Sequence, residues 1–288
     1  MDSGRRHPPT HDVTAETLMR DAERSTGLSD WGGNATFVSG LRVLLASLAE
    51  SSLPLEARQR QIERCRDHLE VRLRLIDHRT RHPETAARDV DGPLVVMGLP
   101  RTGTTALIDL LVQVPAARAI LQWETNALFP PPRREQWATD PRIASTQRHL
   151  DRVALAFPEL VEMHAFGAEL PQECNAVLEL EFWSPNVSGG GGLDRYADWL
   201  AHNVPENPFP IHRWVLQHLQ AHGPSGRWTL KSPFHMFDLP AFLAVYRSAV
   251  FVQTHRDPAA VAPLPRRGGV CGARPVVQRR GTTGRGPR

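Results

Sequence analysis

The segment Pro93–Val112 reads Pro-Leu-Val-Val-Met-Gly-Leu-Pro-Arg-Thr-Gly-Thr-Thr-Ala-Leu-Ile-Asp-Leu-Leu-Val and decides the fold of the chain. Its first part, up to Gly98, is a short continuous apolar run, which is typical of a strand buried on both faces in a parallel sheet. Its last part, from Ala106, has apolar residues at helical spacing. The segment is therefore predicted to fold as a strand, a glycine-containing loop and a helix.

Helical and strand-like patterns continue on both sides of this segment. Upstream, apolar residues recur at helical spacing in two short patterns within residues 14–50 and in a longer one over residues 55–78. Downstream, the sequence predicts strands at Trp228–Lys231 and Val250–Thr254 and helices over residues 142–165, 172–183, 211–222 and 239–247. This alternation predicts an α/β fold, with a P-loop type parallel β-sheet flanked by helices and a helical N-terminal region that extends to about residue 90.

The chain divides into three parts by composition. Residues 1–13 are polar and are expected to form a disordered leader, and residues 14–262 are expected to form the α/β domain. Residues 263–288 are rich in Arg, Gly and Pro and have no periodic apolar face, so burial cannot offset their ordering entropy. We expect this tail to be disordered, or to be a non-native continuation created by a frameshift or truncation near Ala262.

Composition disfavours several classes of protein. No apolar run approaches the roughly 18 to 20 residues that a membrane span needs, and the polar N-terminus has no secretory signal, so no membrane partner is expected. Cys65, Cys174 and Cys271 are isolated in the sequence, which favours a reducing cytoplasm over a disulfide framework. The basic balance comes from the seven arginines of residues 263–288, and the rest of the chain is mildly acidic, so no nucleic-acid partner is expected.

The loop after the predicted strand has the spacing of a phosphate-binding loop. Gly98 and Gly103 enclose four residues and are followed by Thr104 and Thr105. In such a loop, backbone N–H groups and the positive end of the following helix bind a phosphate. ATP-binding loops carry a lysine after the second glycine, whereas this chain has Thr104 there. The difference disfavours an ordinary ATPase or kinase, although another P-loop nucleotide enzyme and an inactive nucleotide-binding remnant stay as alternatives.

The segment Pro100–Thr105 resembles the 5′-phosphosulfate loop of sulfotransferases that use 3′-phosphoadenosine 5′-phosphosulfate (PAPS). Arg101 makes it similar to the loop of tyrosylprotein sulfotransferases and of a large bacterial sulfotransferase group. The resemblance implies transfer of a sulfuryl group from PAPS, the cosubstrate, to a hydroxyl or amine of a small-molecule acceptor. It also implies that the 5′-phosphosulfate is held by Arg101, Thr102, Gly103, Thr104 and Thr105.

Lys231 is the only lysine of the chain, and it ends a predicted strand. Its segment, Leu230–His235, resembles the strand-end motif that supplies a catalytic lysine in cytosolic sulfotransferases. Sulfuryl transfer develops negative charge on the oxygen that bridges phosphorus and sulfur, and a positioned cation stabilises this charge. The resemblance therefore implies catalytic roles for Lys231 and Arg101, and their positive charge makes a metal unnecessary for the reaction.

A later segment, Phe251–Pro258, resembles the part of the family that binds the 3′-phosphate of PAPS. The resemblance assigns this phosphate to Arg256, and a guanidinium suits the task because it can donate two parallel hydrogen bonds. The family places a serine eight residues after this arginine, where the chain has Leu264. The 3′-phosphate site is therefore expected to be incomplete, at the point where the unusual tail begins.

Three residues are candidates for the base that deprotonates the acceptor. Glu124 is the first choice, because it follows the loop helix at about the place where tyrosylprotein sulfotransferases keep a catalytic glutamate. His164 is the second choice. Glu173 is the third, and it lies in Pro171–Cys174, which resembles a recurring segment of the bacterial group. The alternative for each of the three is a surface or helix-capping charge.

His78 and His82 lie four residues apart, a spacing that would suit two metal ligands on one helix. They fall at the end of a predicted helix, just before Pro83, and no carboxylate-rich segment surrounds them. We therefore expect no metal site at this pair or elsewhere in the chain.

Overall fold

A computed structural model of the chain describes residues 13–33, 35–158, 167–188, 192–203 and 207–261. The strands are β1 (Leu94–Gly98), β2 (Ala117–Arg118), β3 (Arg227–Lys231) and β4 (Val250–Thr254). The α-helices are α1 (Ala15–Thr26), α2 (Thr36–Glu50), α3 (Leu55–Arg81), α4 (Pro83–Ala86), α5 (Thr104–Leu111), α6 (Gln122–Asn126), α7 (Pro141–Ala156), α9 (Asn175–Leu178), α10 (Asp194–His202), α11 (Phe209–His222), α12 (Leu239–Val245) and α13 (Pro258–Val261). The 3-10 helices are η2 (Arg134–Thr139), η3 (Glu179–Glu181), η4 (Pro185–Ser188) and η5 (Pro233–Phe237).

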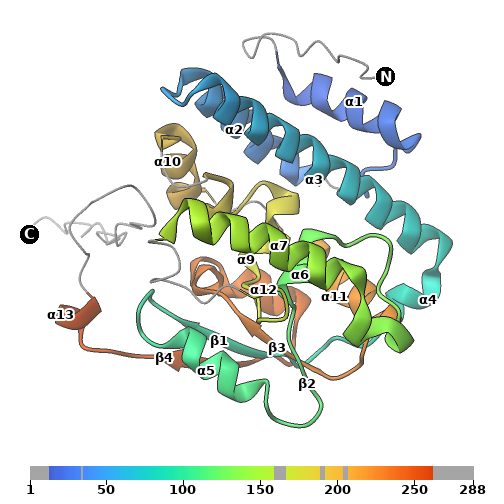
Figure 1. Cartoon of the computed structure of the whole chain (residues 1–288), viewed down its shortest axis with the longest axis vertical. Coiled ribbons are helices and arrows are strands. Elements are labelled where there is room, and N and C mark those ends of the chain that lie inside the picture. Colours follow the sequence, from blue (N-terminus) through green and yellow to red (C-terminus); the bar gives the residue numbers. More distant parts are fainter. Residues whose placement is uncertain (1–12, 34, 159–166, 189–191, 204–206, 262–288) are drawn as a thin grey trace, which may run out of the picture.

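The four strands form one parallel sheet with the order β2-β3-β1-β4. β1 lies in the interior of the sheet, where Val95 pairs with Leu230 of β3 and with Phe251 of β4. Val95 and Val96 are fully buried, as expected for a strand covered on both faces. In Figure 1, α5 lies along one face of the sheet, and α9 and α12 lie on the other. The predicted α/β class, a parallel sheet flanked by helices, is confirmed.

Helices α1, α2 and α3 form a further layer beyond the helices that cover the sheet (Figure 1). Helix α1 begins at a capping box in which Thr14 and Thr17 exchange side-chain-to-backbone hydrogen bonds. Helix α2 approaches the rest of the domain closely at Gly40, because a Cβ there would lie 2.5 Å from the carbonyl oxygen of Phe182. The predicted helical N-terminal region is therefore present and is packed against the α/β part.

Several predicted elements differ from the structure in extent. The helix expected over residues 172–183 is one short turn, α9, followed by η3 and by Phe182 in a left-handed conformation (φ 49°). Residues 177–184 are all buried, so this segment lacks the solvent-facing side that an amphipathic helix has. The helix expected over residues 142–165 spans Pro141–Ala156 in the described part. Strand β2 was not predicted, because two residues carry no periodic pattern.

The ends of the chain lie outside the described residues. These ends comprise residues 1–12 of the expected leader and the whole tail, 263–288, including Cys271. Within the described part, Cys65 and Cys174 are buried free thiols. None of the helices in that part is long and apolar enough to cross a membrane.

Candidate active site

The candidate site lies at the carboxyl edge of the parallel sheet. Gly98, Lys231 and Thr254 are the last residues of β1, β3 and β4, and Gly98 pairs in register with Thr254. Because the three strands are parallel, their ends meet at one edge, which is where open α/β sheets bind ligands. The predicted phosphate loop and the predicted catalytic lysine are thus brought to the same edge by the sheet itself.

The loop from Gly98 to Thr105 contains backbone conformations that residues other than glycine seldom adopt. Arg101 and Gly103 have positive φ angles, 68° and 96°, and such turns point successive N–H groups into one concavity. The Thr102 hydroxyl donates to the carbonyl of Leu99 at 2.6 Å and lies 2.6 Å from the Thr254 hydroxyl. The loop is therefore fastened to the end of β4.

The last two residues of this loop, Thr104 and Thr105, are also the first two residues of helix α5. The first N–H groups of a helix have no partner within the helix, and the helix dipole adds positive potential at the same place. Thr104 stands where an ATP-binding loop would have its lysine. The loop and the helix terminus together can bind an anion through backbone donors without a lysine in the loop.

Lys231 lies between the loop and a carboxylate. It is 3% exposed, and its ammonium nitrogen is 3.1 Å from the Thr105 hydroxyl and 3.2 Å from Oε1 of Glu173. The backbone N–H of Cys174 donates to the carbonyl of Lys231 at 3.0 Å, which attaches the segment carrying Glu173 to the end of β3. A buried cation is thus held next to the predicted phosphate loop.

Glu173 is oriented by two neighbouring side chains. The amide of Asn175 donates to Oε2 of Glu173 at 3.0 Å, and the hydroxyl of Ser232 donates to the side-chain oxygen of Asn175 at 2.6 Å. The Glu173 side chain keeps 25% of its surface exposed, so it can be reached from outside. The result is a chain of contacts that runs from the loop through Lys231 and Glu173 to the turn after β3.

Glu124 lies in different surroundings. It is 1% exposed, its Oε1 accepts from the Arg118 guanidinium at 2.5 Å, and its Oε2 accepts from the backbone N–H of Leu121 at 2.9 Å. The guanidinium in turn lies over the rings of Trp137 and Trp228. Burial raises the pKa of Glu124, and the adjacent Arg118 acts in the opposite direction. Both carboxylate oxygens of Glu124 therefore have partners in the protein.

The remaining predicted residues are placed as follows. Arg256 is exposed, and its guanidinium donates to the backbone carbonyl of Arg101 at 3.2 Å, so it lies beside the loop. His164 and Leu264 lie outside the described residues. The sequence did not single out Thr254, although it falls within the segment that resembles a 3′-phosphate site. It also did not single out Asn175, whose contact with Glu173 depends on the tight turn at α9.

Comparisons with known proteins identify the family of the chain. Residues 93–264 match the model of a sulfotransferase family. The chain is similar to the crystal structure of sulfotransferase STF9 from Mycobacterium avium, with a TM-score of 0.76, 30% identity and coverage of 88% of this chain. It spans 65% of the STF9 chain, which is less than two thirds of that protein.

A second similar structure is that of sulfotransferase STF1 from Mycobacterium tuberculosis H37Rv. Its TM-score is 0.73 at 29% identity, with coverage of 88% of this chain and 70% of STF1. No curated protein sequence matches the chain. The structural likeness thus extends beyond the matched family model into the N-terminal helices.

Proposed function

The chain belongs to the sulfotransferase family, and from this premise we propose that it moves a sulfuryl group from PAPS to a hydroxyl or amine of a small-molecule acceptor. The observation that carries the proposal is the position of Lys231. Its ammonium lies 3.1 Å from the loop residue Thr105 and 3.2 Å from the carboxylate of Glu173. In this position the ammonium can stabilise negative charge on a group bound by the loop. The carboxylate of Glu173 lies next to it and can serve as a base.

The loop Gly98–Thr105 is the proposed holder of the 5′-phosphosulfate. Its positive-φ positions and the N-terminus of α5 supply backbone donors, which suit an anion. Arg101 is proposed to add a side-chain charge, together with the hydroxyls of Thr102, Thr104 and Thr105. Arg256 is proposed to bind the 3′-phosphate, supported by its contact with the loop carbonyl of Arg101.

The proposed reaction exchanges one bond to sulfur for another. The acceptor oxygen or nitrogen attacks the sulfur atom of PAPS, and the bond between sulfur and the bridging phosphate oxygen breaks. The bridging oxygen leaves as part of adenosine 3′,5′-bisphosphate, and Lys231 stabilises the charge that develops on it. The acceptor's proton passes to a base of the protein.

We propose Glu173 as this base in preference to Glu124. Each glutamate has protein donors on both carboxylate oxygens, but a quarter of the Glu173 side chain is exposed, whereas the Glu124 side chain is wholly buried against Arg118. An acceptor can therefore approach the carboxylate of Glu173 more readily than that of Glu124. Glu124 is therefore proposed to fix the structure after β2, and His164 stays as a second candidate base.

The direct test is incubation of the full chain with PAPS and a panel of phenols, alcohols and amines. We expect release of adenosine 3′,5′-bisphosphate that depends on an acceptor and that is lost in Lys231→Ala. Release that is equal in wild type and in Lys231→Ala would contradict the proposal, as would intact PAPS across the whole panel. The buried free thiols of Cys65 and Cys174 support a reducing compartment, and we propose the cytoplasm.

A further inference from the structure

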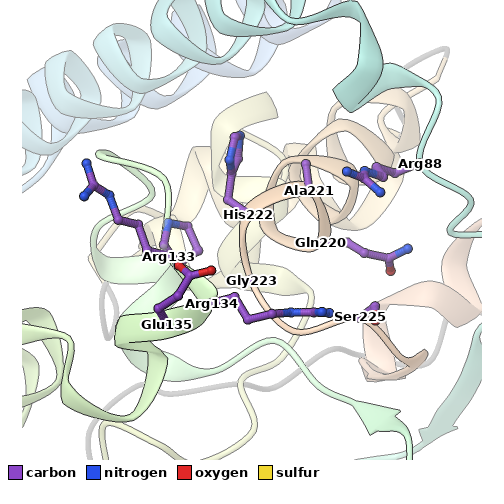
Figure 2. A pocket seen from close by; sticks show the side chains of 10 residues that line it. Arg88, Arg133, Arg134, Glu135, Gln220, Ala221, His222, Gly223 and Ser225 are labelled. Carbon is purple, nitrogen blue, oxygen red and sulfur yellow. Dashed lines mark hydrogen bonds between the residues drawn. The ribbon is translucent and has the colours of Figure 1, made fainter.

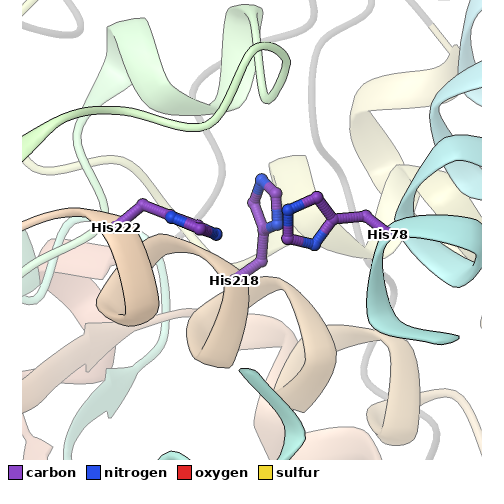
Figure 3. A group of neighbouring side chains, drawn as sticks. All are labelled: His78, His218 and His222. Atoms are coloured by element: carbon purple, nitrogen blue, oxygen red, sulfur yellow. The ribbon is translucent and has the colours of Figure 1, made fainter. Parts of the chain in front are cut away.

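Three histidines from two helices converge at the amino edge of the sheet, away from Lys231. His78 lies near the end of α3, and His218 and His222 lie one turn apart near the end of α11. Taking one ring nitrogen from each residue, these atoms all lie within 4.8 Å of one another (Figure 3). His82, one turn after His78, stacks near it with ring centroids 4.4 Å apart.

One ring nitrogen of each of these three histidines lacks the hydrogen bond that a buried polar atom normally has. Among the described residues, Nδ1 of His78, Nδ1 of His218 and Nε2 of His222 are buried without a partner. His218 is fully buried, and its Nε2 lies 3.3 Å from the carbonyl oxygen of Leu128. Donation from Nε2 to that carbonyl leaves Nδ1 as the nitrogen with the free lone pair, which is the usual arrangement for a metal-binding histidine.

Burial disfavours the protonated forms of His78, His218 and His222. Burial lowers the pKa of His218 to about 3, and burial together with the neighbouring imidazoles of His82 and His222 lowers the pKa of His78 to about 4. Burial also lowers the pKa of His222.

We propose that His78, His218 and His222 bind one zinc ion, with His82 or water as the fourth ligand. Imidazole nitrogens are preferred zinc ligands, and zinc sites are tetrahedral with Zn–N distances of about 2.0–2.1 Å. Two such nitrogens lie about 3.3 Å apart on one ion, so the rings close inward by side-chain rotation on binding. The Oε1 atom of Glu84 lies 3.2 Å from Nδ1 of His82 and can fix that ring as a ligand through its other nitrogen.

The site has a route from solvent. His222 lines a cavity of about 530 Å³, whose wall also includes Arg88, Arg134 and Ser225 (Figure 2). Ser225 precedes the start of β3, whereas Lys231 is its last residue, so the cavity and the candidate active site lie at opposite ends of the strand. The ion is therefore a structural one, which ties the end of α3 to the end of α11.

The test uses the full chain without a polyhistidine tag, freed of metal by a chelator. Titration with Zn²⁺ alone is expected to give one ion per chain. At a free concentration about 100 times Kd, the melting temperature should rise by about 4–5 °C. The double variant His78→Gln/His222→Gln changes two partly exposed residues and is expected to lose both the binding and the shift. His202→Gln, at an exposed histidine on α10, is the matched control and should keep both.

Two further measurements separate loss of zinc binding from loss of folding and identify the type of ligand. The metal-free double variant should melt within a few degrees of the metal-free wild type, and the single variant His222→Gln repeats the test should the double variant fail to fold. Cobalt substitution should give a tetrahedral spectrum without thiolate charge transfer. A thiolate band would place the ion at the buried group Cys174, His212 and His235 instead, and would overturn the proposal. Zinc binding retained by the histidine variants, or no stoichiometric binding by wild type, would overturn it as well.

Discussion

Two neighbouring strands of the sheet each end in a basic residue that pairs with a glutamate, and the two pairs differ in what surrounds them. Arg118 ends β2 and pairs with Glu124 at 2.5 Å, and Lys231 ends β3 and pairs with Glu173 at 3.2 Å. The side chain of Glu124 is wholly buried, whereas a quarter of the Glu173 side chain is exposed.

Under the proposed function, the pair of Arg118 and Glu124 stabilises the fold, and the pair of Lys231 and Glu173 takes part in the reaction. The guanidinium of Arg118 lies over two tryptophan rings, and both oxygens of Glu124 have protein donors. The ammonium of Lys231 instead faces the loop hydroxyl of Thr105. We therefore propose different roles for Arg118 and Lys231, although both are basic residues that end neighbouring parallel strands.

The largest expected effect is on stability, at the buried pair of Arg118 and Glu124, which we call the closed pair. Arg118→Ala leaves Glu124 as a buried charge without its partner, which should lower the free energy of unfolding by about 3–5 kcal/mol. Urea denaturation followed by circular dichroism measures it. The matched control is Arg195→Ala, in an exposed pair with Glu50 at the same 2.5 Å separation, which should cost less than about 1 kcal/mol. Equal costs for the two variants would contradict the distinction between the pairs.

At the partly exposed pair of Lys231 and Glu173, which we call the open pair, Lys231→Ala should lower turnover. Loss of the cation should reduce the rate of sulfuryl transfer from PAPS by about 10²–10³-fold. The loss of stability should be smaller than in Arg118→Ala, because Glu173 is partly exposed and keeps its bond from Asn175. Arg227→Ala, at the exposed start of the same strand, should leave the rate unchanged. A Lys231→Ala protein with wild-type turnover would remove Lys231 from the reaction.

The two glutamates can be compared directly. Glu173→Gln should lower turnover by about 10²-fold, since an amide cannot take the acceptor's proton. Glu124→Gln should reduce stability and leave the turnover of the folded protein near that of wild type. Steady-state rates, corrected for the folded fraction of each variant, decide between them. If Glu124→Gln lowered turnover more than Glu173→Gln, Glu124 would be the base.

The smallest expected effect is at the contact between Lys231 and the loop. Thr105→Val removes a hydrogen bond to a charged group and should slow transfer by about tenfold. Thr105→Ser keeps a hydroxyl and should restore most of the rate. If valine and serine gave the same rate, the contact of Thr105 with the ammonium would have no part in positioning Lys231.

Much of the open pair's surroundings could be predicted from the sequence. The apolar run before Gly98 and the helical spacing after Ala106 predicted strand, loop and helix, and the parallel strands bring Lys231 to the same edge. These features are local in sequence, and parallel pairing then fixes where the strand ends meet. The α/β class and the family were predictable for the same reason.

The closed pair and the histidine cluster could not be predicted in this way. Arg118 belongs to a strand of two residues, which leaves no periodic signal, and its burial depends on tryptophans from two distant segments. The sequence places His78 and His82 one turn apart, but the approach of His218 to them depends on how α3 packs against α11. The expectation that Glu124 is the base rested on its position in the chain, which carries no information about Arg118.

A PAPS site at the carboxyl edge of the sheet can be tested by calorimetric titration of the full chain with adenosine 3′,5′-bisphosphate and, separately, with ATP. We expect saturable binding of the bisphosphate, weakened in Arg101→Ala, and no binding of ATP. Binding of ATP without binding of the bisphosphate would contradict it and would point to another class of nucleotide enzyme. Binding of neither would indicate a fold that keeps the loop without a nucleotide site.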